Sequence, residues 1–361
     1  MGKRIATQRH PGNRQGAKVL DKKITAAQHR IESLWGETKG RCYVSFSGGK
    51  DSTVILSLVK LCQELGTVGA IPAVFCNTGI ELGVTLDFVA FAGDCFYNDM
   101  CIIHPKKSFS ETLKTAGKPI RSKLKSHNLH QWHCGTRTEP LLLALLDKEK
   151  HGRTAIADRD MHFLHDRFPI TPSEKCCDFL KKEPFALFNR DTGMKGTLLG
   201  IRLVEGGVRS IAAVNRDRSG HICTAVKSNG FIQKYPLIDW TDEDIDEYIE
   251  SFDVPLSKAY TEFGFKRTGC AFCPFAKNIQ MDLKHLHDNE PNKYAAAMFW
   301  LKDVYIAQNV MLPFDSSYER EREREWHESY EPMRQEMLRK YRPSSKLVKT
   351  ADQLCLNLSA E

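Results

Sequence analysis

The feature that most constrains the fold is a glycine turn between an apolar run and a helical pattern. Residues 41–46 read Arg-Cys-Tyr-Val-Ser-Phe and predict a short buried strand. The strand ends at Ser47, Gly48 and Gly49, and residues 52–65 predict a helix. Glycines allow a tight turn, and a helix that starts directly after it points backbone N–H groups at an anion. The sequence therefore predicts an anion cradle built from the backbone.

Side chains in the same turn suit a phosphate group. The run is Ser47, Gly48, Gly49, Lys50, Asp51 and Ser52. The two serines can donate hydroxyl hydrogen bonds, and Lys50 supplies positive charge. The loop is not a Walker A loop, because Asp51 stands where that motif needs Ser or Thr. The alternative is an ordinary strand–turn–helix junction. That alternative explains poorly why all six residues of the turn suit a phosphate ligand and lie between a predicted strand and a predicted helix. Lys50 and Asp51 are the candidate catalytic residues.

The rest of the chain predicts an α/β fold with a doubly wound, mainly parallel sheet. A second strand is predicted at residues 70–75 and a third at 100–104, with a helix at 84–92 between them. Ligands on such sheets bind at the carboxyl ends of the strands, where the first turn and Asn77-Thr78-Gly79 both fall. We predict three parts along the chain, which are a flexible basic arm at 1–23, the α/β domain at 24–280 and a helical C-terminal extension at 281–361.

Net charge and hydropathy indicate which ligands and which cellular location to expect. The net charge of +7 suits a protein that handles phosphates or nucleic acid. No apolar run approaches the roughly 20 residues that cross a bilayer, and residues 1–23 lack the apolar centre of a secretory signal. We therefore expect a cytoplasmic protein without a membrane partner. Acidic and basic residues alternate between Ser317 and Lys340, which predicts an exposed helix with ion pairs along it.

Four of the twelve cysteines have the spacing of metal ligands. Cys176 and Cys177 are adjacent, and Cys270 and Cys273 are separated by two residues. Disulfides are rare in a reducing cytoplasm, whereas two thiolates separated by two residues can face one metal centre. Adjacent cysteines suit a cluster with separate iron atoms, while structural zinc more often uses two Cys-x-x-Cys pairs. We predict a [4Fe–4S] cluster, with zinc as the less favoured alternative.

A smaller group of polar residues has no such pattern. His130, His133 and Cys134 lie close together but do not follow the spacing of a known metal site. Three unpatterned side chains of this kind are more often structural than metal ligands. We interpret them as structural.

The ordered series of motifs resembles the phosphoadenosine phosphosulfate (PAPS) reductase-like proteins, members of the pyrophosphate-loop ATP pyrophosphatase superfamily. The resemblance covers residues 40–280, and adenylylsulfate reductases and DNA-phosphorothioation ATP pyrophosphatases look most similar. Both carry a four-cysteine cluster. The matching segments are residues 47–52, 75–81, 117–119, 175–177, 200–202, 235–237 and 267–273.

The resemblance implies an adenine nucleotide alpha-hydrolase-like fold and a set of binding roles. Residues 47–52 would cradle phosphate, and Asn77, Thr78 and Gly79 would line the adenosine. The implied substrate is ATP with Mg²⁺, cut between its α- and β-phosphates. The implied contacts to phosphate or sulfate are Lys118, Arg121, Lys123, Arg202 and Arg209.

The chain also departs from the family pattern. Asn77 stands where the family often has aspartate, and Cys355 lacks the Glu-Cys-Gly-[Leu/Ile]-His tail of true reductases. The leading hypothesis is therefore an ATP pyrophosphatase in sulfur transfer, acting in nucleic-acid thiolation or phosphorothioation with a cysteine desulfurase as a possible partner. One alternative is an adenylylsulfate or PAPS reductase that works with thioredoxin and uses Cys355 as nucleophile. Another is a nucleotide-sensing assembly subunit that docks through residues 317–340.

Overall fold

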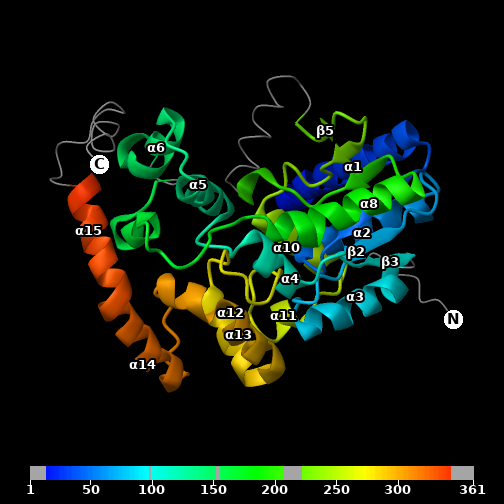
Figure 1. The fold of residues 1–361 in the computed structure, drawn as a ribbon. Helices are drawn as coiled ribbons and strands as arrows, with labels where there is room; N and C mark the ends of the chain where they lie inside the picture. Colours follow the sequence, from blue (N-terminus) through cyan, green and yellow to red (C-terminus); the bar gives the residue numbers. More distant parts are fainter. Residues whose placement is uncertain (1–13, 97–98, 152–154, 206–221, 343–361) are drawn as a thin grey trace. The chain divides into compact units, whose positions relative to one another are not determined.

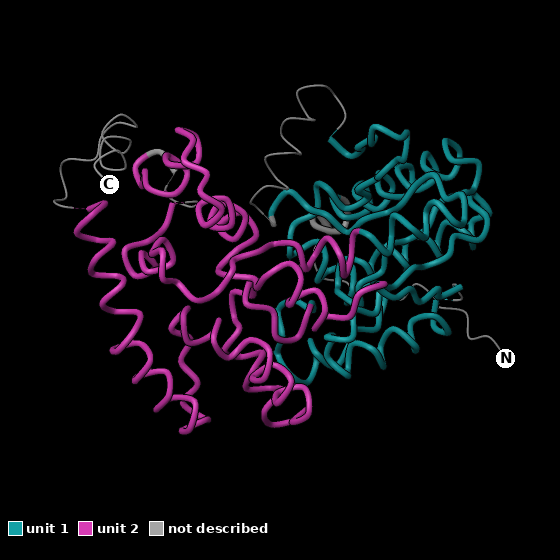
Figure 2. The backbone as a smooth tube through the Cα atoms, viewed as in Figure 1, with its two compact units in different colours: residues 1–105, 183–269 teal, residues 106–182, 270–361 magenta. Residues whose placement is uncertain are grey.

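The computed structural model describes residues 14–96, 99–151, 155–205 and 222–342 (Figure 1). The chain divides into two compact units, each assembled from two separate stretches of sequence (Figure 2). Unit 1 comprises residues 1–105 and 183–269, and unit 2 comprises residues 106–182 and 270–361. The predicted boundary between residues 24–280 and 281–361 divides the sequence differently and stays a prediction.

Unit 1 contains a six-stranded, mainly parallel sheet with the strand order β3-β2-β1-β4-β6-β5. The pairs along β3, β2, β1, β4 and β6 are parallel, and only β5 pairs antiparallel, with β6. This confirms the predicted fold class. The strands are β1 (Cys42–Phe46), β2 (Ala73–Cys76), β3 (Met100–Ile103), β4 (Gly196–Leu198), β5 (Thr224–Val226) and β6 (Ile232–Lys234).

The helices of unit 1 cover both faces of this sheet. Because side chains alternate along a strand, Cys42, Val44 and Phe46 of β1 face one layer and Tyr43 faces the other. The first layer includes residues of α1, α2, α3 and α10, while Tyr43 packs against Phe185 of α8. The helices are α1 (Arg14–Thr38), α2 (Lys50–Glu64), α3 (Gly83–Phe96), α8 (Glu183–Thr192), α10 (Asp242–Ser251) and α11 (Lys258–Thr261), with a short 3₁₀ helix η3 (Leu203–Glu205).

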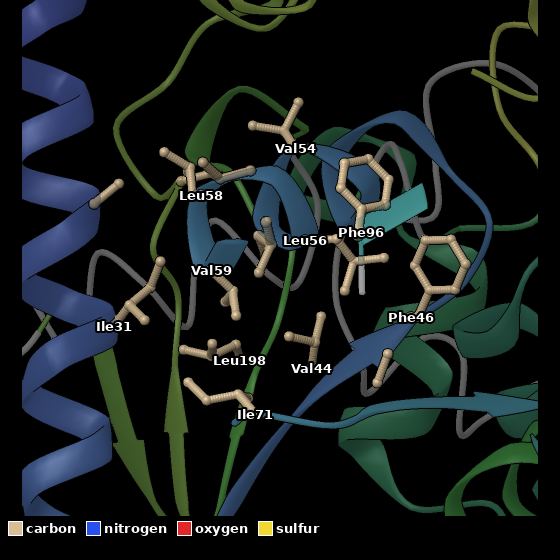
Figure 3. Packing of buried hydrophobic residues seen from close by; sticks show 14 of the residues in the cluster. Ile31, Val44, Phe46, Val54, Leu56, Leu58, Val59, Ile71, Phe96 and Leu198 are labelled. Atoms are coloured by element: carbon tan, nitrogen blue, oxygen red, sulfur yellow. The ribbon is translucent and has the colours of Figure 1, made fainter. Parts of the chain in front are cut away.

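The main hydrophobic core of unit 1 lies between the sheet and helices α1 and α2 (Figure 3). Val44 from β1 and Leu198 from β4 pack with Leu58 of α2 and Ile31 of α1. All four side chains are fully buried. The core therefore fixes α2 against β1, and this packing sets the position of the turn that joins them.

The N-terminal helix begins inside the predicted flexible arm. Helix α1 begins at Arg14, so residues 14–23 of the predicted flexible arm are helical, while residues 1–13 lie outside the described part. The buried residues Leu20, Ile24, Ala27, Ile31 and Leu34 are spaced by three or four positions. This spacing forms one apolar stripe, so Leu20 extends the buried face of the helix beyond the predicted start of the α/β domain at residue 24.

The second strand is shorter than predicted, and the late strand β4 is also short. The second strand begins at Ala73 rather than residue 70, since Pro72 has no N–H to donate to a ladder. The Pro72 carbonyl still accepts a hydrogen bond from the Val44 N–H at 2.9 Å. The late strand ends at Leu198, and residues 199–202 continue as irregular chain.

Unit 2 is helical in its described part. None of the described helices of the chain is both long and apolar enough to span a bilayer. The helices of unit 2 are α4 (Phe109–Ala116), α5 (Lys123–His133), α6 (Glu139–Leu146), α7 (Lys148–His151), α12 (Ile279–Asn289), α13 (Pro291–Ala307), α14 (Ser316–Glu325) and α15 (Glu331–Tyr341), with a 3₁₀ helix η1 (Asp158–Leu164) and π-helical turns η2 (Asp178–Lys182) and η4 (Trp326–Tyr330). The helical C-terminal region is confirmed.

The charged segment at the end of the described chain is not a single exposed helix. It forms α14 and α15, joined by the π-helical turn η4. Tyr318, Arg322 and Tyr330 are buried, and Arg322 pairs with Glu319 at 2.7 Å. The predicted ion pairs along the segment are present. The predicted exposure was wrong for one side, because tyrosines spaced along the segment, which the charge pattern obscures, pack that side into unit 2.

Candidate functional site

The predicted anion cradle lies at the carboxyl end of β1. Gly48 has a φ of +71°, in the left-handed region that favours glycine. A Cβ at Gly48 would lie 2.7 Å from Thr85 Cγ2, closer than side chains tolerate. Gly49 caps α2, whose 15 residues direct their dipole and first N–H groups at this turn. Glycine is therefore required at position 48 by both conformation and space.

Hydrogen bonds within the loop hold its shape. Ser52 Oγ donates to the Gly49 carbonyl oxygen at 2.9 Å and accepts from the Ser47 N–H at 3.2 Å. Thr53 Oγ1 donates to the same Gly49 oxygen at 2.9 Å. Ser52 and Thr53 are buried. In this structure the Ser52 hydroxyl closes the turn, whereas the sequence interpretation expected it to donate to a ligand.

Two residues distant in sequence also reach the loop, and one of them was not expected. Tyr260 OH, from α11, accepts a hydrogen bond from the Lys50 N–H at 3.3 Å. It lies 3.2 Å from Thr268 Oγ1 and accepts from the Thr268 N–H at the same distance. Thr268 belongs to a segment with family resemblance, but no local pattern singles out Tyr260. Its place in the site depends on how α11 packs in unit 1.

The Lys50 side chain forms a solvent-exposed ion pair. Its Nζ lies 2.9 Å from Asp246 Oδ1 of α10 and 5.6 Å from the centroid of the Tyr260 ring. The side chains of Lys50 and Asp246 are 32% and 62% exposed, so water screens their attraction. Such a weak pair can exchange for a ligand phosphate at little cost in free energy.

The second predicted turn follows β2, which pairs with β1 in parallel. The turn is braced by Glu81, which is buried and accepts from the Thr78 N–H at 3.0 Å and from Thr78 Oγ1 at 2.6 Å. The Asn77 side-chain oxygen accepts from the Gly79 N–H at 3.0 Å. The structure thus places both predicted turns at the same edge of the sheet, as parallel pairing requires.

Arg202 comes to this edge from the other neighbour of β1, strand β4. Its Nε lies 2.9 Å from Asp51 Oδ1, and its Nη2 donates to Asp242 Oδ1 at 2.7 Å. The side chain is 8% exposed. The predicted oxyanion contact is therefore engaged by two carboxylates in this structure. Arg209, another predicted contact, lies outside the described residues.

The remaining predicted anion contacts belong to unit 2. Lys118 Nζ pairs with Asp303 at 2.7 Å, and Arg121 Nη2 pairs with Asp160 at 2.5 Å. Lys123 is close enough to Cys177 to lower the pKa of that thiol. The predicted contacts thus fall into two groups, with Arg202 at the loop of unit 1 and these three side chains in unit 2.

The four predicted metal ligands all lie in unit 2. Cys176 and Cys177 precede the π-helical turn η2, while Cys270 and Cys273 form a turn in which the Cys273 N–H donates to the Cys270 carbonyl at 3.3 Å. Cys176 is buried and the other three are partly buried. The fold has therefore placed in one unit two pairs that are separated by 92 residues in sequence.

The pKa values of these thiols depend on one another. The pKa of Cys176 is raised by its hydrogen bond with Cys177, by burial, and by the charges of Cys177, Cys273 and Cys270. The pKa of Cys177 is lowered by the hydrogen bond from Cys176 and by Lys123 and Lys181. The quartet therefore shares one neighbourhood and contains one thiol that favours its thiolate form.

Among the described residues, no three His, Cys, Asp or Glu side chains are arranged to hold a single metal ion. The prediction of Cys176, Cys177, Cys270 and Cys273 as cluster ligands stays a prediction. Cys355, the candidate nucleophile of the reductase alternative, lies outside the described residues.

Comparison with known families gives a match over most of the chain. The model of the phosphoadenosine phosphosulfate reductase domain matches residues 41–157 and 142–276. These ranges contain both turns of the sheet edge and all four cysteines of the quartet. The chain belongs to this family. It is therefore a PAPS reductase-like protein.

The individual relatives of this PAPS reductase-like protein are distant. It is 24% identical to the uncharacterized protein MJ0973 of Methanocaldococcus jannaschii over 78% of this chain and 53% of that protein. It is 23% identical to the uncharacterized protein MJ0066 of the same organism over 73% of this chain and 42% of that protein. The chain thus spans about half the length of these curated relatives.

A solved structure of the family is also similar. The crystal structure of phosphoadenylyl-sulfate reductase from Candida auris, in a phosphate complex, aligns with a TM-score of 0.40 and 16% identity. The alignment covers 73% of this chain and 98% of that chain.

Proposed function

We propose that this protein is an ATP pyrophosphatase that cleaves ATP between its α- and β-phosphates and acts in sulfur transfer. The observation that carries the proposal is the loop of residues 47–52, with Lys50 at the N-terminus of a 15-residue helix. The loop differs from the Walker A type, which usually serves transfer of the γ-phosphoryl group. Its form is that of the pyrophosphate-loop family, in which the β- and γ-phosphates leave together.

Each part of the loop has a task in this reaction. The N–H groups at the start of α2 and the Lys50 ammonium stabilise the negative charge that develops on departing pyrophosphate. Mg²⁺, when bound, neutralises phosphate charge and aligns the leaving group. Asp51 and Asp242 offer oxygens of the kind that Mg²⁺ prefers, and both contact Arg202. The acceptor attacks the α-phosphorus and becomes an adenylate.

The cysteine quartet supports a role in sulfur chemistry. A [4Fe–4S] cluster would be held by Cys176, Cys177, Cys270 and Cys273, and would supply bound sulfide or electronic support to sulfur transfer. Lys123 and Lys181 lower the pKa of Cys177 and thereby favour the deprotonated form that iron binds. The acceptor would be a nucleic acid, which the net charge of +7 suits, and a cysteine desulfurase would supply the sulfur.

The first test is a paired turnover assay on anaerobically purified protein. One arm contains Mg·ATP and measures pyrophosphate, and the other contains adenylylsulfate or PAPS with reduced thioredoxin and measures sulfite. Pyrophosphate without sulfite is expected. Lys50→Ala should abolish pyrophosphate release, whereas Lys60→Ala, on the same helix with its Nζ bonded to the Cys95 carbonyl, should not. Full activity in Lys50→Ala would contradict the proposal.

The cluster has a separate test in iron and acid-labile sulfide analysis of the purified protein. Cys270→Ser should lose both, while Cys101→Ser, at a partly buried cysteine of β3, should keep them. Equal iron and sulfide content in the two variants would contradict the ligand assignment. Zinc in place of iron in the parent protein would favour the alternative metal.

Membership of the PAPS reductase family favours a second candidate, reduction of adenylylsulfate or PAPS to sulfite. The same loop would then bind the phosphate of the substrate without cleaving ATP. Cys355 would have to be the nucleophile, because the tail sequence offers no other thiol after Cys273. Sulfite formation that survives in Cys355→Ser would exclude that role.

A further inference from the structure

A thiol and an imidazole lie in contact at the C-terminal end of α5 in unit 2. Side chains four positions apart share one face of a helix, which brings Cys134 Sγ to 3.7 Å from His130 Nε2. Cys134 is exposed. The next residue, Gly135, has a φ of +83°, and a Cβ there would meet no atom within 4 Å. Open space therefore adjoins the thiol.

The backbone around His130 determines which ring nitrogen faces the thiol. His130 Nδ1 lies 3.0 Å from the carbonyl oxygen of Pro172, and a carbonyl can only accept a hydrogen bond. Nδ1 therefore carries the proton, and in the neutral ring Nε2 presents its lone pair to Cys134. The Cys134 thiol thus contacts a base, His130, which in turn contacts the Pro172 carbonyl that orients it.

The orienting carbonyl is itself held in place by the fold. Pro172 forms an isolated parallel bridge with Lys118. The Lys118 N–H donates to the Thr171 carbonyl at 2.8 Å, and the Ser173 N–H donates to the Lys118 carbonyl at 2.8 Å. A Cβ at Gly117 would lie 2.5 Å from the Thr171 oxygen, so this approach requires glycine. The imidazole is therefore positioned by two segments distant from it in sequence.

His133, on the same helix, provides a contrast. Its Nε2 lies 2.8 Å from the Phe163 carbonyl oxygen, and burial lowers the pKa of its ring. That nitrogen is engaged by backbone, so it is not available to take a proton from a thiol. His130 and His133 therefore differ in role, although no local sequence pattern distinguishes them.

One wall of a polar cavity in unit 2 includes His130, whereas Cys134 is not among the residues that line it. The cavity has a volume of about 430 Å³, and its lining also includes Lys114, Lys118 and Asp303. Lys118 pairs with Asp303 at 2.7 Å, which leaves the cavity with an excess of one positive charge from Lys114. Lys114 Nζ lies 5.3 Å from the centroid of the Trp300 ring. The charge balance favours a small anion.

We propose that Cys134 is a nucleophilic thiol that accepts sulfane sulfur from a small anionic donor of the thiosulfate type, with His130 as its base. Only the choice of sulfur as the transferred atom rests on the proposed function. His130 Nε2 takes the Sγ proton, and Sγ forms a bond with the outer sulfur of thiosulfate. The sulfur–sulfur bond of thiosulfate breaks, and its electron pair leaves with sulfite. The products are a Cys134 persulfide and sulfite, without an added oxidant or reductant.

The test uses the full-length protein with thiosulfate and without any nucleotide. Peptide mass spectrometry should find one added sulfur on Cys134, with sulfite released in equal amount. Cys134→Ser should lose this adduct, and His130→Gln should form it at least about tenfold more slowly, as loss of a general base implies. His133→Gln, whose amide can still donate to the Phe163 carbonyl, is the matched control and should react like the parent.

A pH profile separates a base from a merely structural residue. Alkylation of Cys134 by iodoacetamide should be slower in His130→Gln than in the parent at neutral pH, and the two rates should converge at alkaline pH, where the thiol ionises without help. Equal rates at all pH values, or added sulfur only on the four cysteines of the quartet, would overturn the proposal.

The outcome is independent of the ATP reaction. Lys50→Ala should load sulfur on Cys134 as the parent does, because loading uses no nucleotide. Loading without pyrophosphate release would contradict the proposed function alone. Pyrophosphate release without loading would overturn the Cys134 proposal alone.

Discussion

Arg202 Nε lies 2.9 Å from Asp51 Oδ1, so the irregular chain after β4 is joined to the first turn of α2 by an ion pair. The backbones also approach closely here, since a Cβ at Gly200 would lie 2.9 Å from Asp51 Cβ and 3.2 Å from the Ser52 nitrogen. Arg202 also contacts Asp242 at the start of α10. One guanidinium thus ties the loop of residues 47–52 to the segment that follows β4 and to the start of α10.

Arg202→Ala should therefore destabilise unit 1 as well as weaken the site. The change removes two charge-assisted contacts from a side chain that is 8% exposed, and we expect the free energy of unfolding to fall by about 2 kcal/mol. Urea denaturation measures this. Arg190→Ala is the control, because its pair with Asp191 is exposed and its loss should leave stability nearly unchanged. Equal losses in the two variants would mean that the buried pair does not brace the loop.

Gly48→Ala should abolish nucleotide binding, while Gly66→Ala should preserve it. Both glycines have a φ near +70°, so either alanine costs about 1 kcal/mol of backbone strain. Only at position 48 would the new Cβ also collide with Thr85, at 2.7 Å, whereas nothing lies within 4 Å at position 66. Calorimetric titration with Mg·ATP compares the two variants. Retained binding in Gly48→Ala would show that the turn can adjust.

Glu81→Ala should weaken Mg·ATP binding by about tenfold, which is about 1.4 kcal/mol. The carboxylate accepts both the N–H and the hydroxyl hydrogen of Thr78, and its loss frees the turn after β2. Glu81→Gln should restore most of the affinity, because its amide oxygen can accept the Thr78 N–H while the Thr78 hydroxyl turns to accept from the amide. If the Glu81→Gln variant binds Mg·ATP as poorly as the Glu81→Ala variant, then the charge of Glu81 matters more than its hydrogen bonds to Thr78.

His162 should make the stability of unit 2 depend on pH. Its ring is buried, donates from Nε2 to the Ala307 carbonyl at 2.8 Å, and packs against Phe163, Trp326 and Tyr330. Burial lowers the pKa of His162 to about 4, against opposing contributions from the Ala307 carbonyl and Asp160, while Arg121 and Arg334 lower it further.

The direction of this pH dependence follows from the difference between the folded and the unfolded pKa of His162. A histidine whose pKa is lowered by folding stabilises the native state above its unfolded pKa of about 6.5, and this contribution is lost as pH falls toward 4. We expect the free energy of unfolding to drop by about 3 kcal/mol over this window. His162→Phe should be less stable at pH 7 but should show a smaller drop. An identical pH dependence in the two proteins would assign the effect to other groups.

Local sequence determined the elements around the loop of residues 47–52. The apolar run at 41–46, the glycine turn and the helix after it are set by neighbouring residues, so the sequence predicts β1, the turn and α2 to within two residues. The parallel sheet followed from the alternation of strands and helices. Position 48 also reflects a local requirement, because its positive φ favours glycine in any surroundings.

Only the tertiary structure decided which distant side chains complete the site. Tyr260 reaches the Lys50 N–H across 210 positions, and Arg202 reaches Asp51 after strand β4. The same holds for His130, whose role depends on the Pro172 carbonyl 42 positions away. Spacing along a chain reports neighbours on one helix or strand, whereas the partner that sets a tautomer or pairs a charge is chosen by packing between elements.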